Sequence, residues 1–163
     1  MIIALIGVSG SGKTAVGRAL AERLACPFVD ADDFHPESNI EKMSSGEPLN
    51  DDDRRPWLTA LSQTIDELCT KHIQVVLACS ALKHDYQELL QTSDDCVQFV
   101  LLHGSFELIQ SRIEQRRGHF MPAALLQSQF DTLELPEDAV QVDVTPSIPE
   151  IVDEIISRLH LQS

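Results

Sequence analysis

The chain has 163 residues, of which 43% are hydrophobic and only 5% aromatic, so it can form one domain with an aliphatic core. Its net charge of −14 argues against a general nucleic-acid or anionic-membrane surface, because both partners are negatively charged. No apolar stretch approaches the roughly 20 residues of a membrane span, and the N-terminus lacks the basic segment and cleavage site of a signal peptide. We therefore expect a cytoplasmic protein with no nucleic-acid or membrane partner.

Apolar periodicity predicts alternating strands and helices along the chain. Ile2 to Ile6 is a short continuous apolar run, typical of a strand buried on both faces, whereas apolar residues recur at helical spacing from Thr14 to Leu24. Asp51 to Asp53 and Pro56 indicate a helix N-terminus, where acids and proline are favoured. In chain order we predict strand 2–6, helix 14–24, strand 28–30, a short helix with turns in 35–53, helix 57–71, strand 74–78, helix 82–90, strand 97–102, helices 105–117 and 122–133, strand 140–144 and helix 148–159.

Five short buried strands that alternate with helices imply a parallel sheet with right-handed crossovers. The predicted fold class is α/β, a three-layer α/β/α arrangement around a five-stranded parallel sheet. Residues 1–163 form a single domain in this interpretation, because no linker, repeat or low-complexity tract interrupts them.

The strongest motif is "GVSGSGKT", which spans Gly7 to Thr14 and matches the P-loop pattern G-x-x-x-x-G-K-[ST] in full. It follows a predicted strand and opens a predicted helix, as this motif requires. Its backbone N–H groups can surround the phosphates of ATP, and the helix N-terminus adds a positive dipole end. Lys13 is expected to reach the β- and γ-phosphates and the Thr14 hydroxyl to bind Mg²⁺. The predicted nucleotide-binding residues are Gly7, Val8, Ser9, Gly10, Ser11, Gly12, Lys13 and Thr14.

A second cationic group follows far along the chain. Arg112, Arg116 and Arg117 lie within six residues, and the first two share a helix face because they are four residues apart. In an acidic protein such a cluster can neutralise the charge on a transferring phosphoryl group, although pairing with Glu107 or Glu114 is an alternative. We predict that Arg112 and Arg116 bind the nucleotide, that Arg116 is also catalytic, and that residues 112–133 form a lid.

The rest of the chain favours a small-molecule kinase over other P-loop proteins. The guanine-reading N-K-x-D motif is absent, no D-x-x-G follows the second strand, and the third and fourth strands do not end in an aspartate. Asp30 alone ends a strand near the P-loop, so it is the expected Mg²⁺ ligand beside Thr14. Asp32 can accept the proton of an attacking hydroxyl. Asp33 has no role beyond capping the next helix, and an exposed helix-capping turn is the alternative for all three acids.

Four segments together resemble gluconate kinase (gluconokinase) of the small P-loop type: "GVSGSGKT", "DADDFHPESNIEKMSSGEPLNDDDRRPWL", "CSALKHDY" and "GHFMPAALLQSQFDTLELP". They run from Gly7 to about Pro136, some four-fifths of the chain. Shikimate kinase is similar in its P-loop and in the D-x-D of Asp30 and Asp32. It normally carries a glycine-rich substrate loop where this chain has residues 79–83.

The resemblance implies phosphorylation of the 6-hydroxyl of D-gluconate by ATP, with Mg²⁺ dependence, a mobile lid and commonly a homodimer. It raises His35, Asn39 and Lys42 as candidates for binding the hydroxyls, beside Asp32. Arg54 opens a helix just after this segment and is the candidate for the carboxylate, with pairing to Asp51–Asp53 as the alternative.

Three further residues have weaker assignments. Ser80 and Lys83 lie beyond the carboxyl end of the third strand, where α/β sheets bind ligands, but a helix-capping Ser80 and a solvated Lys83 are equally compatible with the sequence. Trp57 is interpreted as a core or hinge anchor, with a stacking platform as the alternative. A kinase of another small acceptor, such as shikimate or a nucleoside monophosphate, and a nucleotide-binding regulatory module are the alternative functions.

The cysteines are predicted to be free. Cys26, Cys69, Cys79 and Cys96 are widely spaced with no C-x-x-C pair, so we interpret them as small buried hydrophobic residues in a reducing compartment and expect no disulfide and no zinc site.

Overall fold

Five parallel strands form one sheet in the order β2-β3-β1-β4-β5. The structure is a computed structural model that describes residues 1–91, 96–115 and 122–162. The strands are β1 (Ile2–Ile6), β2 (Phe28–Asp30), β3 (Val75–Ala78), β4 (Val97–His103) and β5 (Val140–Asp143). The predicted parallel sheet is therefore confirmed, and the ends of the predicted strands agree with these to within one residue.

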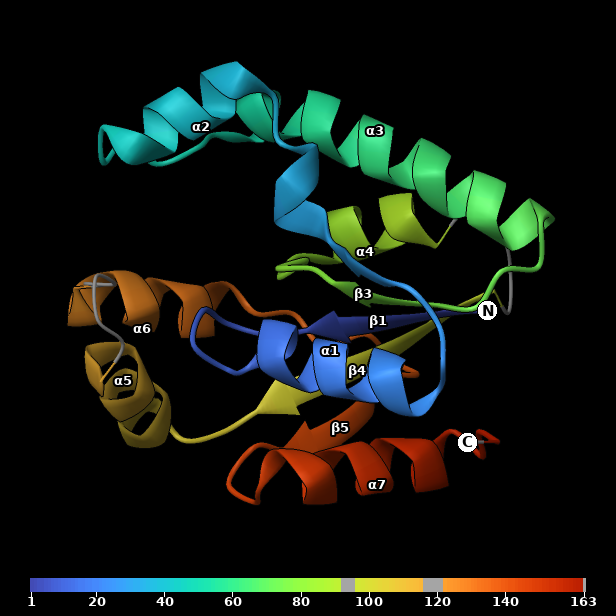
Figure 1. Cartoon of the computed structure of the whole chain (residues 1–163). Helices are drawn as coiled ribbons and strands as arrows, with labels where there is room; N and C mark the ends of the chain where they lie inside the picture. The colour runs from blue at the N-terminus through green and yellow to red at the C-terminus, as the bar shows by residue number, and fades with distance from the viewer. Residues whose placement is uncertain (92–95, 116–121, 163) are drawn as a thin grey trace.

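Helices cover both faces of the sheet (Figure 1). They are α1 (Lys13–Arg23), the 3₁₀ helix η1 (Ala31–Phe34), α2 (Glu37–Ser44), α3 (Asp51–Thr70), α4 (His84–Leu90), α5 (Phe106–Gln115), α6 (Ala123–Thr132) and α7 (Ile148–Arg158). Apolar residues of α3 and α4 pack on one face of the sheet, and those of α1 and α7 pack on the other. In the described ranges, no helix combines the length and apolar character needed to cross a membrane. The three-layer prediction is confirmed.

The position of β1, the central strand of the sheet, decides where a ligand can bind. β1 lies between β3 and β4, so the chain leaves β1 toward one edge of the sheet and later returns to build the other edge. In open α/β sheets the loops at the carboxyl ends of the strands separate at such a point and leave room for a ligand. The loop after β1, which is the P-loop, lies at this point. Helices α2, α5 and α6 also lie toward this end of the sheet (Figure 1).

Helix α3 begins earlier than the sequence pattern indicated. Its N-cap is Asn50, whose side chain accepts a hydrogen bond from Asp53 N at 2.8 Å, while Asp53 Oδ2 accepts from Asn50 N at 2.9 Å. This reciprocal capping box satisfies two backbone donors and starts the helix at Asp51. The three acids therefore form the first turn instead of preceding it, and Pro56 lies inside the helix.

The prediction of four free cysteines is wrong for two of them. Cys69, near the end of α3, forms a disulfide with Cys96, just before β4. Sequence spacing could not indicate this pair, because 27 positions separate the residues and only the packing of α3 over the sheet brings their Cα atoms to 6.0 Å. Cys26 and Cys79 are free, as expected, and Cys79 is buried. Because disulfides are rare in proteins of reducing compartments, the Cys69–Cys96 disulfide weakens the expectation of a reducing compartment.

Candidate active site

The P-loop connects β1 to α1 in a conformation that requires glycine. Gly7 has φ +146°, and a Cβ at this position would lie 2.6 Å from the carbonyl oxygen of Leu102 in β4. Lys13 Nζ donates to the carbonyl oxygens of Gly7 and Val8, both at 2.9 Å, and so closes the loop into a ring. Helix α1 begins directly after this loop, with Gly12 as its N-cap, and has no acid in its first turn. The loop is thus shaped for an anion.

Two oxygen groups that fit a magnesium ion meet beside the P-loop. The Thr14 hydroxyl, in the first turn of α1, donates to Asp30 Oδ2 at 3.3 Å. The other oxygen, Asp30 Oδ1, accepts from the backbone N–H of Asp32 at 3.1 Å and caps η1. No group of three or more His, Cys, Asp or Glu residues in the described part of the chain could hold a metal. Mg²⁺ needs no such group, since it commonly takes one or two protein oxygens and completes its shell with phosphates and water.

Asp32 projects from η1 next to this pair. Partial desolvation raises the pKa of its carboxyl, and the negative charge of Asp30 raises it further, while His35 and Lys13 act in the opposite direction. The side chain is nevertheless 75% exposed, so solvent screens these effects and an incoming hydroxyl can reach the carboxylate. A more basic, accessible carboxylate beside the phosphate loop is suited to accept a proton.

The segment after η1 is held by side chains that the sequence marked as substrate ligands. His35 stacks on Trp57 with ring centroids 4.4 Å apart, and burial lowers the pKa of this imidazole. Trp57 is buried and donates from Nε1 to the carbonyl oxygen of Ala31 at 2.6 Å, which confirms it as a core anchor. Asn39 is buried and donates from Nδ2 to the Asp53 carbonyl oxygen at 2.8 Å. Lys42 pairs with Asp53 Oδ2 at 2.7 Å.

A polar cluster joins the start of α3 to the start of α4. The Tyr86 hydroxyl donates to Asp51 Oδ1, and Lys83 Nζ lies 3.4 Å from the same oxygen. Arg54 Nη1 lies 3.8 Å from Asp51 Oδ1 and donates to the Tyr86 oxygen at 3.4 Å. Arg54 thus makes the pairing that was its alternative assignment, and Lys83 is not simply solvated.

Tyr86 is a member of this cluster that the sequence analysis missed. Its place three residues after Lys83 on a predicted helix was the available signal, because residues three apart lie on one helix face. The predicted cap by Asp33 is wrong, and so is the alternative assignment of Ser80 as a helix cap. The N-cap of α2 is Pro36, with no side-chain cap from Asp33, and the N-cap of α4 is Lys83 rather than Ser80.

The second cationic group is described only in part. Arg112 Nη2 donates to the carbonyl oxygen of Val144 at 2.6 Å, so the side chain reaches the loop that follows β5. The predicted catalytic residue Arg116 lies outside the described residues, as does Arg117.

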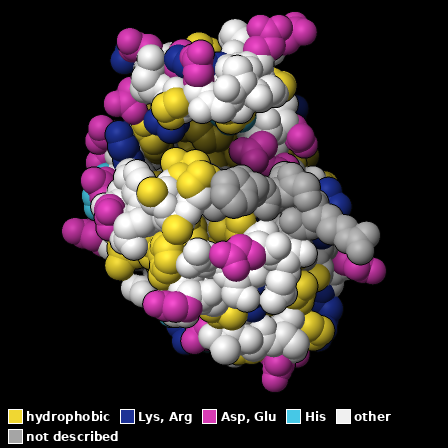
Figure 2. Space-filling view, turned by 90° about the vertical axis from the view of Figure 1, so that its left-hand side faces the viewer, with side chains coloured by type: hydrophobic (Ala, Val, Ile, Leu, Met, Phe, Trp, Pro, Cys, Tyr) yellow, Lys and Arg dark blue, Asp and Glu magenta, His cyan; other side chains and the backbone are white. Residues whose placement is uncertain are grey.

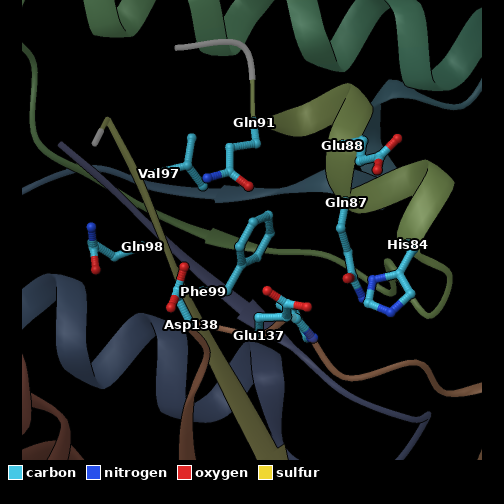
Figure 3. A pocket seen from close by; sticks show the side chains of 10 residues that line it. His84, Gln87, Glu88, Gln91, Val97, Gln98, Phe99, Glu137 and Asp138 are labelled. Carbon is cyan, nitrogen blue, oxygen red and sulfur yellow. The ribbon is translucent and has the colours of Figure 1, made fainter. Parts of the chain in front are cut away.

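The molecular surface at the carboxyl end of the sheet is hollowed between its upper helices and the body below (Figure 2). The hollow is bordered by basic, acidic and hydrophobic side chains. Another pocket, of about 710 Å³, lies between α4, the first part of β4 and residues 136–138 (Figure 3). Its charged lining includes Glu88, Glu137 and Asp138 but no Lys or Arg, and no P-loop residue contributes to it. Phosphate groups would be repelled there, so this pocket is not the nucleotide site.

Comparison with known proteins agrees with the geometry. The pattern of the shikimate kinase family matches residues 9–159. A probable gluconokinase of Xenopus tropicalis is 49% identical over 95% of this chain and 91% of its own length. The thermosensitive gluconokinase of Escherichia coli is 44% identical over 92% of this chain and 82% of its own. This chain belongs to the gluconokinase family.

Solved structures support the same assignment. The crystal structure of a gluconokinase from Sinorhizobium meliloti superposes with a TM-score of 0.85 at 46% identity, covering 97% of this chain and 90% of that one. Shikimate kinase from Aquifex aeolicus, at 21% identity and a TM-score of 0.62, shares the fold. This chain therefore shares its fold with a solved gluconokinase and with shikimate kinase.

Proposed function

We propose that this protein transfers the γ-phosphoryl group of ATP to the 6-hydroxyl of D-gluconate, giving 6-phosphogluconate and ADP. The near-full-length identity to gluconokinases carries this proposal, because it includes both the P-loop and the acceptor-side segment. A shikimate or nucleoside monophosphate acceptor has no comparable support.

The P-loop residues bind the phosphates in this mechanism. Backbone N–H groups of the loop and the N-terminus of α1 would hold the phosphate oxygens. Lys13, which bonds to the Gly7 and Val8 carbonyls, would bind the β- and γ-phosphates. Thr14 and Asp30 would hold Mg²⁺, which neutralises phosphate charge when bound. The metal also explains why a carboxylate stands beside a phosphate site.

The acceptor side depends on Asp32 and the residues around it. Asp32 removes the proton of the attacking hydroxyl, and the hydroxyl oxygen then attacks the γ-phosphorus as the bond to the β-phosphate oxygen breaks. His35, Asn39 and Lys42 are proposed to bind gluconate hydroxyls. Arg54, Lys83 and Ser80 are proposed to bind the rest of the acceptor, its carboxylate above all, with Tyr86 added to this group because it contacts Arg54.

The nucleotide side includes the arginines. Arg112 is proposed to bind the nucleotide, and its side chain bonds to the Val144 carbonyl oxygen in the loop after β5. Arg116 is proposed to neutralise charge on the transferring phosphoryl group. Residues 112–133 are proposed to act as a lid within a single 1–163 kinase domain.

A homodimer and a cytoplasmic location are also part of the proposal. Sedimentation tests the homodimer, and cell fractionation tests the location.

An acceptor panel tests the function. Purified protein with ATP and Mg²⁺ is expected to phosphorylate gluconate far faster than shikimate, nucleoside monophosphates or other sugar acids, measured as ADP release. Isolated product should carry the phosphate on C6. Absent turnover of gluconate, or equal turnover of all acceptors, would refute the proposal. ADP binding by calorimetry serves as the control that the protein is folded.

A further inference from the structure

Helix α6 makes a direct polar contact with the P-loop that the mechanism above does not use. Gln129 Oε1, on α6, accepts a hydrogen bond from the backbone N–H of Ser9 at 2.7 Å. The two residues are 120 positions apart in the sequence, so the contact exists only because α6 folds back onto the loop. Figure 1 shows α6 beside the segment that joins β1 to α1.

An apolar cluster holds Gln129 in this place. Leu126 of α6 is buried with Val8 of the P-loop and with Ile109 and Ile113 of α5. Gln129 is three residues beyond Leu126, so both side chains project from the same side of the helix. The apolar packing of α6 against the P-loop and α5 therefore fixes the position of Gln129 relative to Ser9.

The contact lies at the β/γ end of the phosphate loop. Lys13, whose ammonium serves the β- and γ-phosphates in P-loop kinases, bonds to the carbonyl of Val8, the residue directly before Ser9. The carboxamide of Gln129 thus lies on the side where the terminal phosphate of ATP is expected.

The two ends of this carboxamide have different tasks. Its oxygen is engaged by Ser9 N–H, and this bond fixes the rotation of the amide group. Its nitrogen makes no hydrogen bond to any residue in the described part of the chain. A hydrogen bond from an oriented N–H group to a phosphate oxygen is stronger than one between two neutral groups, because the acceptor is charged.

We infer that Gln129 is a positioning residue of the phosphoryl-transfer site: its oxygen holds Ser9 in the P-loop, and its nitrogen donates to the terminal phosphate of ATP. The inference rests on the proposed kinase function for its catalytic part. It would make ATP binding depend on the position of α6, the helix that carries Gln129.

Three variants separate this role from simple support. Gln129→Leu removes both the acceptor and the donor, whereas Gln129→Glu keeps an oxygen for Ser9 N–H but replaces the donor with a negative charge. Gln127→Leu is the matched control, because Gln127 is an exposed glutamine on the same helix whose amide bonds to Asp131 at 2.9 Å, away from the P-loop.

The readouts are the calorimetric affinities for ADP and for a non-hydrolysable ATP analogue, kcat, and the melting temperature. In Gln129→Leu we expect affinity for the analogue and kcat each to fall roughly tenfold or more, with ADP affinity nearly unchanged. Gln129→Glu should keep the melting temperature and ADP affinity of the parent protein but bind the analogue at least as weakly as Gln129→Leu. Gln127→Leu should match the parent protein throughout.

Several results would overturn the inference. If Gln129→Leu behaves like Gln127→Leu, the contact has no role at the site. An equal loss of ADP and analogue affinity together with a lower melting temperature would make Gln129 a structural support only. Parent-like binding of the analogue by Gln129→Glu would show that the carboxamide does not face the terminal phosphate. The binding data need no gluconate turnover, so a wrong acceptor assignment would not be confused with any of these results.

Discussion

Replacing Gly10 with alanine tests how tightly the P-loop is packed against α5. Gly10 has φ +80°, and a Cβ built on it would lie 2.5 Å from Ile113 Cγ1 and 2.9 Å from Ile113 Cδ1. Gly46, in the turn after α2, also has φ +80°, but a Cβ there would have no heavy atom within 4 Å. The two glycines therefore share one backbone conformation and differ in the space around it.

The expected magnitudes follow from this difference. The left-handed conformation alone makes alanine unfavourable by about 1–2 kcal/mol, so Gly46→Ala should lower the free energy of unfolding by that amount. Gly10→Ala adds overpacking against the buried Ile113, which typically costs a further 1–3 kcal/mol, for a total of about 2–5 kcal/mol. Since Ile113 belongs to the apolar cluster under the loop, the loop itself should shift and ADP binding should weaken in Gly10→Ala only.

Urea unfolding and ADP calorimetry measure both effects. Combining Gly10→Ala with Ile113→Val removes Cδ1, one of the two closest atoms, so the pair should be more stable than the sum of the single changes predicts, by about 0.5 kcal/mol or more. Equal destabilisation by Gly10→Ala and Gly46→Ala, with parent-like ADP binding in both, would refute the reasoning.

Three further predictions concern the acids, the histidine and the cysteines. Asp32→Asn should lower kcat about 10²–10⁴-fold while ADP still binds, with Asp33→Asn as the control; near-parent turnover would remove Asp32 as the base. Burial holds the pKa of His35 below 6.5, so the unfolded chain takes up more protons as the pH falls through 6.5, and the melting temperature should drop between pH 7.5 and 5.5. His35→Gln should lose that dependence, and an unchanged profile would contradict the assignment. Thiol titration of the unreduced, unfolded protein should find Cys26 and Cys79 only, and reduction should lower the free energy of unfolding by about 3.5 kcal/mol; four titratable thiols would contradict the disulfide.

The fold could be predicted from the sequence because each element carries a local signal. A continuous apolar run such as Ile2–Ile6 is compatible with a strand covered on both faces, and its alternation with helical patterns requires a parallel sheet. The predicted start of α3 at residue 57 is too late, because the capping box of Asn50 and Asp53 begins the helix at Asp51, ahead of Pro56.

The site could be predicted only as far as its residues are close in sequence. Gly7 to Thr14 and Asp30 to Asp32 were found because the chemistry of a phosphate loop and of a strand-terminal acid depends on a few consecutive positions. Tyr86 could not be linked to Asp51 in this way, since the contact depends on how α4 packs beside α3.

The amino-acid sequence by itself determined the P-loop, the five-stranded parallel sheet and the kinase chemistry, because these depend on neighbouring residues and on the period of apolar positions. Only the tertiary structure decided that Cys69 bonds to Cys96, that Asp51 joins Lys83 and Tyr86, and that Gln129 holds Ser9. Each of these contacts joins segments whose separation is set by the packing of helices on the sheet. No local pattern records such a distance, because it depends on the volume of the side chains between the two segments.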